Sequence, residues 1–134
     1  MIAKISGKVI EGKRMGNKLG FPTLNIDPVG NDLPEDGVYI GSAFFGGEAR
    51  PCVINQGVQP TLPSGERRIE AHILDFQGDL YGQNVELTYL SYIRPERKFA
   101  SKEELVAQLA EDVRVAREWF GAAYTPQLLA SSGD

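Results

Sequence analysis

Six short runs of β-favouring residues, separated by stretches rich in glycine and proline, constrain the fold more than any other feature of this sequence. They cover residues 2–10, 23–27, 38–45, 50–56, 67–76 and 84–94. The last two runs alternate with period two, so apolar residues gather on one face of each: Ile69, Ala71 and Ile73, then Val85, Leu87 and Tyr89. Arg68, Glu70, His72 and Leu74 are expected on the opposite face of the first. Many short strands with frequent turns predict an all-β barrel or sandwich.

A single helix is expected after the strands. Ser101 and Glu104 form a capping box, in which each side chain can bind the backbone N–H of the other residue. Apolar residues then recur at helical spacing, at Leu105, Leu109, Val113, Ala116 and Phe120. Gly121 is a reasonable helix end. We therefore predict a barrel with this helix packed on it over residues 1–121, followed by a short C-terminal tail over residues 122–134.

Length and composition limit the class of protein. A chain of 134 residues with 42% hydrophobic residues fits one folded domain. No apolar run approaches the roughly 18 residues needed to cross a membrane, and Met1–Lys4 lacks the apolar core of a signal peptide. Cys52 is the single cysteine, which excludes an internal disulfide and disfavours a cysteine-based metal site. These features predict a cytoplasmic protein, with a monomer as the default.

The net charge of −4 disfavours sequence-independent binding of nucleic acid, which depends on basic residues that neutralise phosphates. The charge is unevenly distributed, because residues 4–18 hold five basic residues and one acidic residue. A solvated basic surface explains this segment as well as a ligand does.

Part of the same segment, residues 12–20, is rich in glycine and basic residues. Glycine lets backbone N–H groups approach a polyphosphate closely. The segment matches neither the phosphate-binding Gly-x-x-x-x-Gly-Lys-Ser/Thr loop nor the dinucleotide-binding fingerprint. Spacing alone therefore favours a surface loop without a ligand.

Three polar residues on the expected strands could carry chemistry. Thr23 and Asn25 share one face of 23–27 and present the oxygen donors that Mg²⁺ accepts, although a polar strand end is a simpler explanation. Glu70 lies in the middle of a strand, where acids are depleted, and could accept a proton during phosphoryl transfer. A surface ion pair with Arg68 is its alternative. His72, the single histidine, is best explained as a structural residue.

Several motifs, taken together and in order, resemble the riboflavin kinase family, including the kinase module of bacterial bifunctional FAD synthetases. They cover roughly residues 5–120, and the stretches 19–25 and 70–76 are the most specific. The matching stretches are Leu19–Ile26, Leu33–Pro34 with Gly37–Tyr39, Asn55–Thr61, Glu70–Phe76 with Asp79–Gly82, and Ile93–Phe99. The resemblance implies a six-stranded antiparallel Greek-key barrel with a C-terminal helix, and transfer of the γ-phosphate of ATP to riboflavin to give FMN.

The resemblance also implies roles for individual residues. Glu70 matches the catalytic base, and Thr23 and Asn25 match the Mg²⁺-binding pair. The nucleotide-binding set would be Gly12, Gly16, Lys18, Gly20, Thr23, Asn25, Ile73, Asp75 and Tyr81. Arg94, Phe99 and Asp112 fall in the segments that line the flavin pocket between barrel and helix.

Two departures from the family pattern bear on function. Relatives often carry a basic residue where this chain has Asn17; Lys18 is adjacent and can substitute, and otherwise ATP affinity would be lower. No H-x-G-H-type nucleotide motif is present, so the chain should make FMN without making FAD.

The alternatives to this assignment are a non-catalytic flavin- or nucleotide-binding module, a kinase module excised from a bifunctional enzyme, a nucleic-acid-binding barrel, and a kinase that uses CTP.

Overall fold

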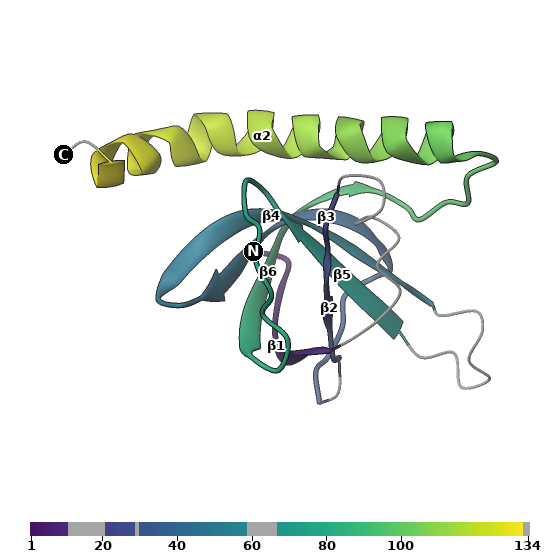
Figure 1. Ribbon diagram of the computed structural model, residues 1–134, viewed down its shortest axis with the longest axis horizontal. Helices are drawn as coiled ribbons and strands as arrows, with labels where there is room; N and C mark the ends of the chain where they lie inside the picture. Colours follow the sequence, from purple (N-terminus) through teal and green to yellow (C-terminus); the bar gives the residue numbers. More distant parts are fainter. Residues whose placement is uncertain (11–20, 29, 59–66, 133–134) are drawn as a thin grey trace. The chain divides into compact units, whose positions relative to one another are not determined.

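The computed structural model describes residues 1–10, 21–28, 30–58 and 67–132, with side chains through residue 121. The chain divides into two compact units, Met1–Lys98 and Phe99–Asp134. The first holds the strands β1 (Ala3–Ile10), β2 (Leu24–Ile26), β3 (Gly37–Phe45), β4 (Glu48–Val58), β5 (Arg67–Ile73) and β6 (Asn84–Arg94), and the second holds the helix α2 (Lys102–Ser132) (Figure 1).

The strands form a closed antiparallel barrel in the order β1-β2-β5-β4-β3-β6. Three consecutive strands, β3, β4 and β5, lie side by side, and β6 returns beside β3. This arrangement is a Greek key. The predicted six-stranded Greek-key barrel with one C-terminal helix is therefore confirmed, whereas the predicted packing of that helix on the barrel stays a prediction.

The interior of the barrel collects the apolar face of every strand. The alternation predicted for the last two strands is confirmed, because Ile69, Ala71, Ile73, Val85, Leu87 and Tyr89 are all buried. Burial of this face fixes the register, since a slip of one residue would turn it toward water.

The fifth strand ends earlier than predicted. It stops at Ile73 because Asp75 adopts a φ of 55°, a left-handed conformation that aspartate tolerates better than most residues. The Leu74 N–H donates to the Pro51 carbonyl at 3.0 Å. Leu74, expected on the polar face, is consequently buried in the turn.

The helix begins as predicted and ends later. The Ser101 hydroxyl accepts from the Glu104 N–H at 3.2 Å, and the Glu104 carboxylate accepts from the Ala100 N–H at 3.4 Å, one residue before the expected donor. The predicted end at Gly121 is wrong, because α2 continues to Ser132. One glycine inside a helix costs only about 1 kcal/mol relative to alanine. Within the described residues, no helix is both long and apolar enough to span a membrane.

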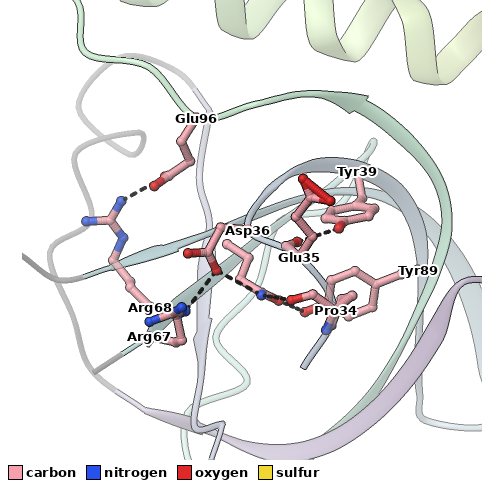
Figure 2. Close-up of polar contacts among 9 residues, drawn as sticks. Pro34, Glu35, Asp36, Tyr39, Arg67, Arg68, Tyr89 and Glu96 are labelled. Atoms are coloured by element: carbon pink, nitrogen blue, oxygen red, sulfur yellow. Dashed lines mark hydrogen bonds and ion pairs between the residues drawn. The ribbon is translucent and has the colours of Figure 1, made fainter. Parts of the chain in front are cut away.

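A buried polar network ties the barrel interior to the segment before β3 (Figure 2). Gln56 is completely buried, and its Oε1 accepts from the Tyr89 hydroxyl at 2.8 Å. Its Nε2 donates to the Pro34 carbonyl at 2.8 Å and to Asp36 at 3.1 Å. Asp36 also pairs with Arg67 at 2.9 Å. Every polar group of the Gln56 side chain therefore has a partner.

Candidate active site

Strand β5 carries a polar row on the outer face of the barrel. Residues on its other face, such as Ile69 and Ala71, are buried inside, so Arg68, Glu70 and His72 point outward. This confirms the prediction that this strand has an apolar face and a polar face at these positions. Glu70 occupies the middle of that row.

The register of the neighbouring strands places an asparagine on each side of Glu70. Asn25 of β2 is its cross-strand partner on one side, and Asn55 of β4 is its partner on the other. Directly paired residues present their side chains on the same face. A carboxylate flanked by two amides across three strands is therefore the centre of the site.

The contacts of Glu70 hold its carboxylate in place. The Thr23 hydroxyl donates to Oε1 at 3.1 Å, and Arg68 Nε lies 2.7 Å from Oε2. The Nε–H group of Arg68 is not aligned for a hydrogen bond, so the contact between Arg68 and Glu70 is purely ionic. Burial raises the pKa of Glu70, while the Arg68 guanidinium and the Thr23 hydroxyl oppose that rise. A carboxylate with a raised pKa is the better proton acceptor.

Glu96 shares the guanidinium that Glu70 uses. Its Oε2 lies 3.6 Å from Arg68 Nη2 (Figure 2). The carboxylate of Glu96 lies against the backbone of Gly57, where an added Cβ would sit 1.6 Å from Oε1. Burial raises the pKa of Glu96, and Arg68 opposes the rise. Arg68 thus joins two half-buried carboxylates, and the absence of a side chain at Gly57 makes room for the second.

The two asparagines beside Glu70 each carry an unsatisfied atom. Asn25 is only 5% exposed, and its buried Nδ2 has no acceptor among the described residues. The buried Oδ1 of Asn55 likewise has no donor there. Buried polar atoms are nearly always paired in folded proteins, so each atom requires a partner beyond the described residues.

His72 has a structural role, as the sequence predicted. Its Nδ1 donates to the Pro22 carbonyl at 2.7 Å, because a carbonyl can only accept. The ring also meets Phe21 edge to face, at 5.7 Å between centroids. Both contacts hold the segment that leads into Thr23.

A cleft of about 280 Å³ begins beside Thr23. It is lined by Pro22, Thr23, Leu24, Ala71, Ile73, Phe76, Gln77, Gly78 and Asp79. Thr23 therefore belongs both to the cleft and to the environment of Glu70. Of the predicted nucleotide-binding residues on β5 and beyond, Ile73 lines the cleft. Asp75 occupies the adjacent turn, and Tyr81 is exposed, its N–H donating to Asp79 at 2.9 Å.

Comparison with known proteins decides the family. The family model for riboflavin kinase (Flavokinase) matches residues 2–120. The chain belongs to the riboflavin kinase family.

Relatives of this riboflavin kinase family member include longer proteins. This chain is 40% identical over 118 residues to a bifunctional riboflavin kinase/FMN adenylyltransferase of Escherichia coli. The alignment covers 87% of this chain and 38% of that protein. This chain is 39% identical over 117 residues to the RNA-binding riboflavin kinase RibR of Bacillus subtilis, covering 87% of this chain and 50% of that protein. The chain thus spans half or less of these relatives.

A solved structure supports the fold assignment. The crystal structure of riboflavin kinase from Trypanosoma brucei superposes with a TM-score of 0.60 at 23% identity. The match covers 88% of this chain and 79% of that one. The predicted family and its barrel fold are confirmed together.

The structure does not test the remaining predicted site residues as a group. Gly12, Gly16, Lys18 and Gly20 lie outside the described residues. Arg94 ends β6 and donates from Nη1 to the Pro95 carbonyl at 3.1 Å. Phe99 and Asp112 belong to the unit that holds α2, where Asp112 accepts from Gln108 at 2.9 Å. A flavin pocket formed by Arg94, Phe99 and Asp112 stays a prediction.

Reasoning from the sequence assigned no role to Arg68 toward Glu70 beyond a surface ion pair, and none to Asn55 or Glu96. Asn55 could have been noticed as a polar residue directly after the apolar run Cys52–Ile54. Its position opposite Glu70 depends on the register between β4 and β5, which no local pattern reveals. Glu96 follows the last strand and reaches Arg68 only in the folded barrel.

We expect Arg68→Met to lower turnover about tenfold, because Glu70 loses the cation that orients its Oε2. Riboflavin affinity should change little, so the effect should appear in kcat and not in KM. Arg67→Met is the matched control, since Arg67 pairs with Asp36 and not with Glu70. Equal losses in both variants would show that Arg68 acts only through stability.

Proposed function

We propose that this chain transfers the γ-phosphate of ATP to the 5′-hydroxyl of riboflavin, giving FMN and ADP. The observation that carries this proposal is the position of Glu70, which lies on the outer face of the barrel, bonded to a threonine that also lines the cleft. A base beside a pocket for the phosphate donor is the arrangement that phosphoryl transfer to an alcohol requires.

The chemistry follows from these contacts. The riboflavin hydroxyl gives its proton to the Glu70 carboxylate while its oxygen attacks the γ-phosphorus. The bond between that phosphorus and the β–γ bridging oxygen breaks, and the electron pair leaves with ADP. Burial supports proton acceptance because it raises the pKa of Glu70, and the contacts with Thr23 and Arg68 restrict the carboxylate to one orientation.

Thr23 and Asn25 fit a divalent cation. Their side chains offer hard oxygen donors, that of Thr23 in the cleft wall, and the Glu70 carboxylate lies next to both residues. Mg²⁺ sites that also bind phosphates use such oxygen donors. Nδ2 of Asn25 has no acceptor in the described part of the chain, so it could donate to a phosphate oxygen, whereas only the amide oxygen could bind the cation. Bound there, Mg²⁺ would neutralise charge on the transferred phosphate. No cluster of three His, Cys, Asp or Glu residues competes as a metal site within the described residues.

The finer features of the function also belong to this proposal. This chain by itself should stop at FMN, because its sequence contains no H-x-G-H-type motif for adenylyl transfer. We propose ATP as the donor, a cytoplasmic location, a monomeric state and no binding of nucleic acid. The RNA-binding name of the Bacillus subtilis relative makes the last point worth testing, by a binding assay at low and high salt.

The deciding experiment is a turnover assay with riboflavin, a nucleotide and a divalent metal, followed by chromatographic separation of the flavins. We expect FMN only when ATP and metal are both present, and no FAD. CTP in place of ATP, and omission of metal, are the controls. Flavin binding without FMN formation would favour the non-catalytic binding module.

A further inference from the structure

Asn55 lies beside the proposed catalytic base and is not used by the mechanism described above. It is the cross-strand partner of Glu70 on β4, on the side opposite Thr23 and Asn25. Its Oδ1 is buried and accepts no hydrogen bond from the described residues. An amide oxygen in this position requires a donor.

The residues directly adjacent to Asn55 on the same face of the sheet have no side-chain donor to offer. Its cross-strand partner on β3 is Val38, and the residues two positions away along β4 are Val53 and Gly57. On the remaining side Glu70 is an acceptor when ionised. The diagonal neighbours Arg68 and His72 also lie on this face, but Arg68 contacts the carboxylates of Glu70 and Glu96, and His72 binds the Pro22 carbonyl. The described residues therefore leave the Asn55 oxygen without a donor.

The geometry of the transfer indicates which ligand supplies the donor. In phosphoryl transfer the attacking and leaving oxygens lie roughly in line, on opposite sides of the phosphorus. In the proposed function the phosphate donor occupies the cleft that Thr23 lines, which puts it on the β2 side of Glu70. The attacking alcohol then approaches from the β4 side, where Asn55 lies.

We propose that Asn55 determines acceptor specificity, with its Oδ1 accepting a hydrogen bond from a hydroxyl of the polyol chain next to the hydroxyl that is phosphorylated. This inference rests on the proposed kinase function and names one contact within it. A hydroxylated side chain, such as the ribityl chain of riboflavin, satisfies the buried oxygen, whereas an acceptor that lacks that hydroxyl leaves it unpaired.

The test compares acceptors in the wild-type chain and in Asn55→Val. The acceptors are riboflavin and three analogues that each lack one ribityl hydroxyl, at the 2′, 3′ or 4′ position. We expect wild type to prefer riboflavin over the 4′-deoxy analogue by about 10- to 100-fold in kcat/KM, the range for a lost hydrogen bond that leaves a buried partner, and to discriminate less against the other two analogues. In Asn55→Val that preference should fall below about threefold. Without the Asn55 oxygen, riboflavin loses the same hydrogen bond that the analogue lacks, so riboflavin becomes a poorer substrate than it is for wild type.

Stability separates this role from a structural one. Removing an unpaired buried oxygen should leave the unfolding temperature unchanged or raise it. Asn84→Val is the matched control, because Asn84 is exposed at the start of β6, and it should retain wild-type acceptor preference. Unchanged discrimination in Asn55→Val, or a lowered unfolding temperature with equal loss on every acceptor, would overturn the inference. A wild-type chain that phosphorylates no flavin would contradict the kinase function itself, before any variant is compared.

Discussion

Replacing Glu70 with glutamine is expected to lower turnover about 10²- to 10⁴-fold while leaving flavin binding intact. A positioned general base contributes this much to a proton transfer, which corresponds to about 3–5 kcal/mol of transition-state stabilisation. Glutamine keeps the shape of the side chain, and its carbonyl can still accept from the Thr23 hydroxyl. It cannot take the proton of the attacking alcohol.

The measurement pairs FMN formation with riboflavin fluorescence quenching on the same preparations. Glu86→Gln serves as the matched control, because Glu86 lies on β6, pairs with Lys4 at 3.6 Å and is 42% exposed. That variant should retain wild-type turnover and binding. Near wild-type turnover in Glu70→Gln would remove Glu70 from the mechanism and return it to the role of a surface ion-pair partner for Arg68.

The second large effect is expected on stability, at the buried amide of Gln56. Gln56→Leu has a similar volume but leaves the Tyr89 hydroxyl and the Pro34 carbonyl without their partner. Each buried group left unpaired costs about 1–3 kcal/mol, so we expect a loss of about 2–5 kcal/mol in the free energy of unfolding. Burial raises the pKa of Tyr89, so its hydroxyl stays protonated and cannot avoid the penalty by ionising.

Urea denaturation followed by near-ultraviolet circular dichroism would measure this loss through the packing of the tyrosines. The double variant Gln56→Leu with Tyr89→Phe is the control, because removing donor and acceptor together is nearly neutral. It should recover part of the lost stability, and the Pro34 carbonyl accounts for the remainder. A single variant as stable as wild type would show that the network contributes nothing.

Much of the barrel was predictable because its strands bury one face. The alternation at Ile69, Ala71 and Ile73 is a local pattern, and so is the polar face that carries Glu70. The end of β5 was not predictable from alternation, because the left-handed backbone at Asp75 depends on the turn that Leu74 closes against Pro51. The end of α2 was missed because glycine is only a weak helix terminator.

The candidate site was predictable only where a local stretch of sequence carries the signal. Thr23, Asn25 and Glu70 were found through residue type and family resemblance, and the structure brings these three together. Asn55 and Glu96 were missed because their proximity to Glu70 depends on strand register and on the path of the chain after β6. Such long-range pairings leave no trace in a single stretch of sequence.

The brevity of β2 has a consequence for motion. Among the described residues, this strand closes the barrel with two residue pairs to β1 and three to β5, whereas β3 and β4 pair along nine residues. Amide protons in the least supported part of a sheet exchange with solvent first, because opening there breaks the fewest bonds. Asn25 lies in the middle of that strand. The part of the barrel expected to open at the lowest free energy is therefore the strand that carries Asn25, one of the proposed metal-binding residues. A metal or substrate bound there would slow the exchange of the β2 amide protons.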